Sequence, residues 1–141
     1  MNARILVVED EEIMRITVLD HLRAQNWPAD EAADGAAALE LVRANHYDLI
    51  LSDIRMPGLD GETLLTRVKQ LSPRTDVVMM TAHGSTDDAV RCLKKGAADY
   101  ILKPFDLDDL SFRIGRILEM QEVKARCVSL EQCCGQRRPI I

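Results

Sequence analysis

The sequence alternates short apolar runs with longer amphipathic segments, and this alternation limits the fold more than any other feature. Short runs rich in Val, Ile and Leu predict strands, and Pro28 allows one further short strand after it. The expected strands lie near residues 4–8, 29–33, 48–52, 77–80 and 99–102. An amphipathic segment follows each strand, which is typical of a parallel sheet. We therefore predict a doubly wound α/β fold in which helices cover both faces of a five-stranded sheet.

The helical segments carry apolar residues three or four positions apart, and these residues are expected to face the sheet. The predicted inward positions are Met14, Val18, Leu19 and Leu22; Ala38, Leu41 and Val42; Leu64, Leu65, Val68 and Leu71; Ala89, Val90, Leu93 and Ala97; and Leu110, Ile114, Ile117 and Leu118. A core of this size fits one domain with a short extension, which the length of 141 residues also indicates.

Composition and charge exclude several classes of function. Hydrophobic residues make up 47% of the chain and charged residues 29%, as in a soluble globular domain. The apolar runs are much shorter than a membrane-spanning helix and acidic residues come too early for a signal peptide, so we expect a cytoplasmic protein without a membrane anchor. A net charge of -5 argues against direct nucleic-acid binding, because a phosphate backbone requires a basic face. The four cysteines are expected to be reduced thiols, because their spacing suits neither a disulfide framework nor a zinc site.

Charged or hydroxyl side chains stand where four of the apolar runs end. Glu9 and Asp10 follow the first run. Asp53, Thr81 and Lys103 follow the third, fourth and fifth runs, and the short second run is not one of the four. Because the carboxyl ends of parallel strands line one crevice, these residues are predicted to meet there. Crowded carboxylates repel each other unless a cation lies among them, and a set this small suits magnesium, which keeps waters and phosphate oxygens as further ligands. The combination predicts a metal-assisted phosphate site.

Each of these residues also has an ordinary structural explanation. The acidic stretch at residues 9–12 fits the solvated start of a helix, and a lone Thr or Lys at a strand end is usually structural. Asp53 favours the functional interpretation, because it closes an apolar strand and has no evident capping role. An Asp carboxylate attacks phosphorus when a metal ion and an ammonium group neutralise the developing charge, and Lys103 would supply that ammonium. The hydroxyl of Thr81 would bind a phosphoryl oxygen.

Four motifs together resemble the receiver domain of bacterial two-component response regulators over residues 4–120. They are VVED at residues 7–10, SDIRMPG at 52–58, MTAH at 80–83 and YILKPF at 100–105. The resemblance implies a flavodoxin-like fold and a signalling role rather than an enzyme activity. It also implies that Asp53 accepts a phosphoryl group from a sensor histidine kinase, and that Thr81 and Lys103 bind this group.

The same resemblance implies a magnesium ion as the cofactor. Asp10 and Asp53 would bind the ion directly, Glu9 would bind it through water, and the backbone carbonyl of Arg55 would be a further ligand. Many receivers carry Asp where Glu9 stands, so the longer side chain is a small departure that would alter metal affinity. Pro104 corresponds to the family's proline that follows the lysine through a cis peptide bond.

Thr81 and Tyr100 resemble the family's switch pair, in which phosphorylation draws the hydroxyl inward and leaves room for the aromatic ring. A tyrosine that simply belongs to the core is the alternative for Tyr100. Arg55 and His83 occupy positions that in the family modulate how fast the phosphoryl group is lost. Exposed loop residues are an equally good interpretation of both.

The pattern changes after Glu119, which divides the chain into a receiver domain at residues 1–120 and a segment at 121–141. The apolar positions of this segment recur at steps of three and four: Met120, Val123, Cys127, Leu130 and Cys134. This spacing fits a coiled-coil seam that would form a homodimer, and equally the polar-edged end of the last helix. Gly135 and Pro139 end the pattern.

Three sequence segments resemble receivers of the nitrogen-regulator type: MTAHGS at residues 80–85, KPFDL at 103–107 and the terminal RRPII at 137–141. In those proteins a linker helix leads into an AAA+ ATPase that acts on sigma-54 RNA polymerase. We therefore expect residues 121–141 to be a linker helix and the start of a truncated output domain. The chain has no Walker A motif, so we expect no ATP hydrolysis by it. A stand-alone receiver is the alternative, which the linker-like segment argues against. A phosphatase of the haloacid dehalogenase type is more distant, because Arg55 stands where its second Asp is needed.

Overall fold

The computed structural model, which describes residues 3–81 and 86–134 and the side chains of residues 3–81 and 87–123, is built on a parallel sheet. The strands are β1 (Ile5–Val8), β2 (Ala29–Ala32), β3 (Leu49–Asp53), β4 (Asp76–Thr81) and β5 (Asp99–Leu102). They lie in the order β2-β1-β3-β4-β5. This is the flavodoxin-like strand order, so the predicted fold class is confirmed.

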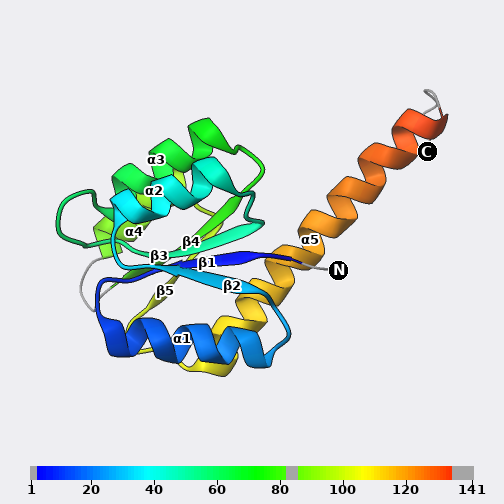
Figure 1. The fold of residues 1–141 in the computed structure, drawn as a ribbon. Helices are drawn as coiled ribbons and strands as arrows, with labels where there is room; N and C mark the ends of the chain where they lie inside the picture. Colours follow the sequence, from blue (N-terminus) through cyan, green and yellow to red (C-terminus); the bar gives the residue numbers. More distant parts are fainter. Residues whose placement is uncertain (1–2, 82–85, 135–141) are drawn as a thin grey trace.

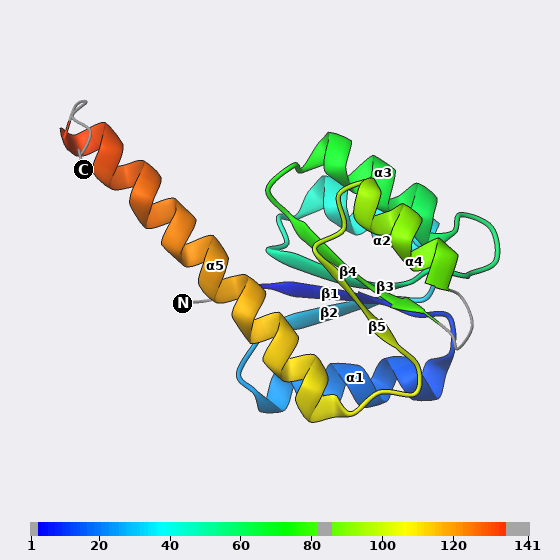
Figure 2. The ribbon, with the colours of Figure 1, turned by 180° about the vertical axis from the view of Figure 1, so that it is seen from behind.

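Helices cover both faces of the sheet (Figure 1). They are α1 (Glu12–Ala24), α2 (Gly35–Ala44), α3 (Gly61–Leu71), α4 (Thr86–Lys94) and α5 (Leu107–Cys134). Helices α1 and α5 pack against one face and α2, α3 and α4 against the other (Figures 1 and 2). Among the residues that the structure describes, no helix combines the length and the apolar character needed to cross a membrane.

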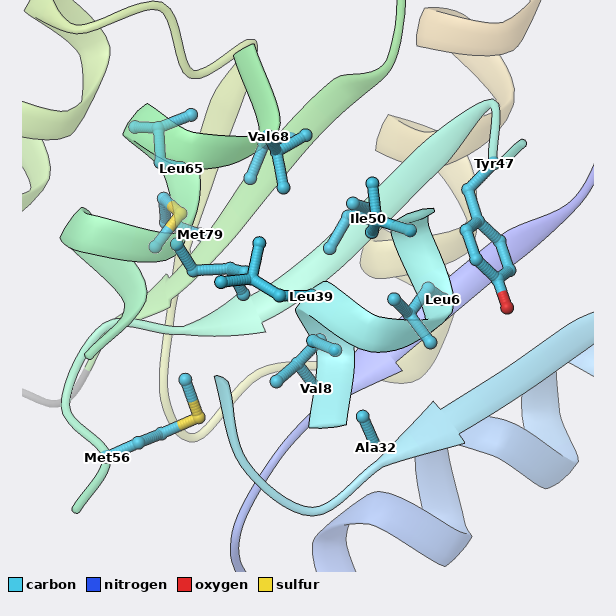
Figure 3. Close-up of a cluster of buried hydrophobic side chains, with 14 of the residues drawn as sticks. Leu6, Val8, Ala32, Leu39, Tyr47, Ile50, Met56, Leu65, Val68 and Met79 are labelled. Atoms are coloured by element: carbon cyan, nitrogen blue, oxygen red, sulfur yellow. The ribbon is translucent and has the colours of Figure 1, made fainter. Parts of the chain in front are cut away.

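Alternate residues of the central strands form the two layers of the core. In β1, Ile5 and Val7 face α1 and α5, whereas Leu6 and Val8 face α2 and α3. Figure 3 shows the second layer, in which side chains from α2 and α3 close over the sheet. Burying one such side chain contributes roughly 1.5–3 kcal/mol. The strands that end at the acidic cluster are therefore held firmly on both sides.

Three apolar residues that we expected in the core are exposed, and the prediction was wrong for them. They are Leu71 at the end of α3, which is 50% exposed, and Val90 and Leu93 in α4, which are 40% and 38% exposed. In α4 it is Ala89 and Cys92 that are fully buried. The helix turns only a narrow stripe toward the sheet, and periodicity predicts the direction of such a stripe better than its width. The other predicted inward positions are buried or partly buried.

Helix α5 continues beyond the sheet as a single helix to Cys134 (Figure 2). The Nε2 atom of Gln121 fastens it to the amino-terminal edge of the sheet, donating hydrogen bonds to the Asp48 carbonyl (2.8 Å) and to Oδ2 of Asp76 (2.6 Å). Met120 and Val123 lie near this anchor and are more than half exposed. The remaining positions of the predicted seam lie outside the described side chains.

Candidate functional site

The carboxyl ends of the strands bring three carboxylates together. Glu9 and Asp10 follow β1 and Asp53 ends β3, and one carboxylate oxygen of each lies within 4.8 Å of the other two. β1 and β3 are neighbours, with Val8 paired to Ser52, so the sheet order itself produces this closeness. These strand ends lie on the side of the molecule opposite the projecting end of α5 (Figure 1).

Lys103 reaches into this cluster from the end of β5. Its ammonium group donates hydrogen bonds to Oε1 of Glu9 (2.7 Å) and to Oδ2 of Asp53 (2.9 Å). Its backbone N–H donates to the carbonyl of Thr81 at 2.8 Å, which ties it to the adjacent strand. The Lys103–Pro104 peptide bond is cis, as the resemblance implied. The predicted meeting of a carboxylate pair and an amine is therefore present in the structure.

Burial and pairing set the charges of this cluster. Glu9 is 1% exposed, and this burial raises the pKa of its carboxyl against the opposing hydrogen bond from Lys103. Burial would lower the pKa of Lys103, but the hydrogen bonds from its ammonium group to Glu9 and Asp53 outweigh burial and raise that pKa. Lys103 therefore stays charged at neutral pH and offsets the repulsion between the two carboxylates.

Thr81 and Tyr100 lie on the same face of the sheet, one residue pair apart. In the β4–β5 register Met79 pairs with Tyr100 and Thr81 pairs with Leu102, so all four side chains share one face. Thr81 is fully buried at the strand end nearest the acidic cluster. Tyr100 is partly buried and packs against the core layer beneath α4. This placement suits a switch pair, and the switching itself stays a prediction.

The side chain of Arg55 pairs with helix α4. It is 72% exposed and its Nη2 atom pairs with Oδ2 of Asp88 in α4 at 2.7 Å. The predicted role of its backbone carbonyl as a metal ligand stays a prediction. His83 lies outside the described residues.

One residue that contacts the site was not singled out from the sequence. The Nη1 atom of Arg15 in α1 donates a hydrogen bond to the backbone carbonyl of Glu9 (2.9 Å), and its Nε atom pairs with Glu31 of β2 (2.8 Å). The Arg15 side chain is only 14% exposed. An Arg in the first turns of the helix after the acidic pair was the only signal, and it is a weak one.

Gly61 is the second residue whose role the sequence did not reveal. A Cβ atom at this position would lie 2.1 Å from the carbonyl oxygen of Asp53 and 2.8 Å from Cα of Ile54. Only glycine lets α3 begin this close to the end of β3. An Asp–Gly pair in a sequence is typical of a turn, and this gives no indication of the close approach.

The donor set fits a small hard cation. Glu9 and Asp53 are buried carboxylates, whereas Asp10 is exposed, so a bound ion would keep a side open to waters and to a phosphoryl oxygen. This arrangement suits magnesium, which usually takes one or two carboxylates and completes its octahedron with water and phosphate. Lys103 would then have to share the two carboxylates with the ion.

The chain matches a family model described as the response regulator receiver domain over residues 5–115. The regulatory protein AtoC of Escherichia coli is 39% identical over 129 residues, which are 92% of this chain and 28% of AtoC. The transcriptional regulator NtrC of the same species is 41% identical over 103 residues, which are 73% of this chain and 22% of NtrC. The chain thus spans about a quarter of the length of these relatives.

A solved structure agrees with these sequence matches. The crystal structure of NtrX from Brucella abortus superimposes with a TM-score of 0.91 at 34% sequence identity. The match covers 100% of this chain and 32% of NtrX. The extended α5 is therefore included in the match.

Proposed function

Because the chain belongs to the response regulator receiver family, a family of signalling domains, we propose that Asp53 accepts a phosphoryl group from a sensor histidine kinase. The observation that carries this proposal is the contact of Lys103 with Asp53 beside the other two carboxylates. A lone buried Asp would be a poor nucleophile toward an anionic phosphoryl group. An Asp next to a fixed ammonium group and a cation site is suited to that reaction.

The transfer exchanges one bond to phosphorus for another. A carboxylate oxygen of Asp53 forms the new O–P bond while the N–P bond of the phosphohistidine breaks, and the imidazole leaves with the bonding electrons. Lys103 pairs with a phosphoryl oxygen, and the hydroxyl of Thr81 donates a hydrogen bond to another. Magnesium, when bound by Asp10, Asp53, the Arg55 carbonyl and, through water, Glu9, would neutralise the charge on the phosphoryl oxygens.

Phosphorylation would act on the rest of the molecule through the paired positions of Thr81 and Tyr100. A phosphoryl group adds about -1.5 to -2 charges and three acceptor oxygens. Movement of the Thr81 hydroxyl toward it would open space on the face that Tyr100 shares. The surface formed by α4, β5 and α5 would then change, as a shift between two populations whose size depends on differential binding of the phosphoryl group.

The C-terminal segment supports a role within a longer regulator. We infer a receiver at residues 1–120 and a linker with the start of an output domain at 121–141, the latter of the AAA+ type that acts on sigma-54 RNA polymerase. Continuity of α5 to Cys134 and the more than threefold greater length of AtoC and NtrC support this division. The exposed Met120 and Val123 support a homodimer through the linker. A cytoplasmic location is inferred from the receiver family.

The proposal is tested by treating the chain with beryllofluoride or an acyl phosphate in the presence of magnesium. We expect intact-mass analysis to show one phosphoryl adduct after acyl phosphate treatment and none on Asp53→Asn. Asp87→Asn, which changes an exposed Asp in the first turn of α4, is the matched control and should keep the adduct. The same adduct on Asp53→Asn would rule out this site.

A further inference from the structure

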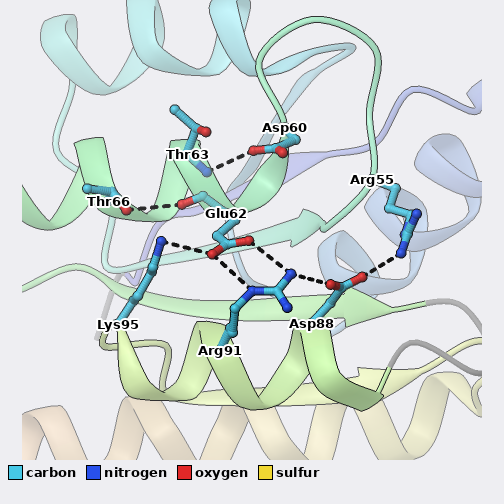
Figure 4. Close-up of polar contacts among 8 residues, drawn as sticks. All are labelled: Arg55, Asp60, Glu62, Thr63, Thr66, Asp88, Arg91 and Lys95. Carbon is cyan, nitrogen blue, oxygen red and sulfur yellow. Dashed lines mark hydrogen bonds and ion pairs between the residues drawn. The ribbon is translucent and has the colours of Figure 1, made fainter.

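An ion-pair network joins the loop after β3 to helices α3 and α4 (Figure 4). Arg55 pairs with Asp88 at 2.7 Å, and the other carboxylate oxygen of Asp88 pairs with Arg91. Arg91 also contacts Glu62 at 3.4 Å, and Lys95 pairs with Glu62 at 2.8 Å. The five side chains form an alternating row of three cations and two anions.

The two carboxylates are the covered members of this network. Asp88 and Glu62 are 14% and 19% exposed, whereas the side chains of Arg55, Arg91 and Lys95 are 72%, 53% and 48% exposed. Hydrogen bonds from two cations to each carboxylate lower the pKa of both Asp88 and Glu62. Isolated exposed pairs contribute little, but charges that share partners act together.

The network connects the two segments that leave the candidate site. Arg55 stands two residues after Asp53, and α4 is the first helix after Thr81. The α3 member, Glu62, follows Gly61, which packs on the Asp53 carbonyl. Helix α3 is thus a fixed support.

Helix α4 is held less firmly by apolar packing than α3 is. It buries the small side chains of Ala89 and Cys92, and its larger apolar residues, Val90 and Leu93, are substantially exposed. Charge pairing therefore makes up a large share of what positions α4 against α3.

We propose that this network is a latch that holds α4 in its unphosphorylated position, and that phosphorylation of Asp53 opens it by competing with Asp88 for Arg55. The inference rests on the proposed function. A phosphoryl group is a stronger partner for a guanidinium than one carboxylate is. The exposed Arg55 side chain is free to exchange partners, and its departure leaves Asp88 with Arg91 alone. By thermodynamic reciprocity, weakening the latch should strengthen binding of a phosphoryl analogue.

The test measures the affinity of the full chain for beryllofluoride in the presence of magnesium. In Asp88→Asn we expect the affinity to rise roughly two- to fivefold, the range that loss of an exposed charge pair allows. Asp87→Asn is the matched control, because it removes the same charge from the same turn of α4, and no described contact pairs Asp87 with a cation. Any rise in the beryllofluoride affinity of Asp87→Asn reflects only the loss of a negative charge. This rise should be well below the one in Asp88→Asn.

A second variant guards against an indirect effect of Asp88→Asn on the start of α4. Glu62→Gln removes the α3 partner of Arg91 and Lys95 and leaves Arg91 to pair with Asp88 alone, which weakens the hold of Asp88 on Arg55. It should therefore also raise the affinity, with faster amide hydrogen exchange in α4 before phosphorylation. Equal affinities in Asp88→Asn and Asp87→Asn, or no gain in Glu62→Gln, would overturn the latch. Failure of the unaltered chain to bind beryllofluoride would instead contradict the proposed function.

Discussion

At the scale of single residues, Glu9 is held from two directions. Lys103 binds its side chain from β5, and Arg15 binds its backbone carbonyl from α1. Arg15 is in turn tied to Glu31 in β2, so the loop that carries Glu9 and Asp10 is braced against the sheet. Residues that orient metal ligands in this way commonly matter for metal affinity almost as much as the ligands do.

Replacing Arg15 by Lys should weaken magnesium binding. The substitution keeps the positive charge but removes the two-armed contact with Glu9 and Glu31, so any loss reflects positioning rather than charge. We expect about a tenfold loss of magnesium affinity, measured by isothermal titration calorimetry, which is the low end for such supporting residues. Arg67→Lys changes an exposed arginine of α3 and should bind magnesium as the unaltered chain does. Equal magnesium affinities for all three chains would show that Arg15 does not position the metal ligands.

The sequence was sufficient to predict which side chains gather at the strand ends. Glu9, Asp53 and Lys103 could be grouped because strand order places the carboxyl ends of neighbouring strands together, whatever the sequence distance. The two residues that support the site, Arg15 and Gly61, could not be predicted in this way. Arg15 and Gly61 depend on where a helix lies on the sheet to within about an ångström, and no periodicity contains that information.

At the scale of secondary-structure elements, two helical glycines differ in whether the approach of their helix to a neighbour requires glycine. Gly61 begins α3 against the end of β3, where a Cβ atom would meet backbone at 2.1 Å. Gly115 lies within α5, where the nearest atom to an added Cβ would be in the ring of Trp27 at 3.8 Å. The first contact is impossible without a backbone shift, and the second is an ordinary van der Waals contact.

Alanine should therefore have opposite effects at these two glycines. We expect Gly61→Ala to lower the free energy of unfolding by about 2–4 kcal/mol, because the overlap is with backbone. Gly115→Ala should raise it by about 0.5–1 kcal/mol, because alanine favours a helix interior. Urea denaturation followed by circular dichroism measures both. A neutral Gly61→Ala would show that α3 shifts easily relative to β3.

The helices were predicted less completely than the strands. Each strand was correct to within about a residue, and the buried strands β1, β3 and β4 are apolar runs bounded by turns. In α4 the positions of Val90 and Leu93 suggested a wider buried face than the one that Ala89 and Cys92 provide. How much of a helix is covered depends on its neighbours, here β4 and β5, and not on its own sequence.

At the scale of the whole molecule, the candidate site and the projecting helix lie at opposite ends of the sheet (Figure 1). Gln121 fastens α5 at the far end, beside the starts of β3 and β4. The same two strands end at Asp53 and Thr81. A change at the site can therefore reach α5 through these strands.

Shortening the linker should weaken self-association without unfolding the receiver. A chain that ends at Val123 keeps the Gln121 anchor and loses the later seam positions, whereas one that ends at Glu119 loses both. Each apolar residue buried in a seam contributes roughly 1.5–3 kcal/mol. We therefore expect the dimer dissociation constant to rise by about tenfold or more in both shortened chains. Equal dissociation constants for the 123-residue and full chains, measured by analytical ultracentrifugation, would refute a seam.

The uninterrupted course of α5 also constrains how such a module can be joined to other proteins. An α-helix turns by about 100° per residue, so every residue inserted or removed after Gln121 rotates the downstream partner by that angle. A chimera that keeps the helical phase would present its effector in the native orientation. One that is shifted by two residues would present nearly the opposite side.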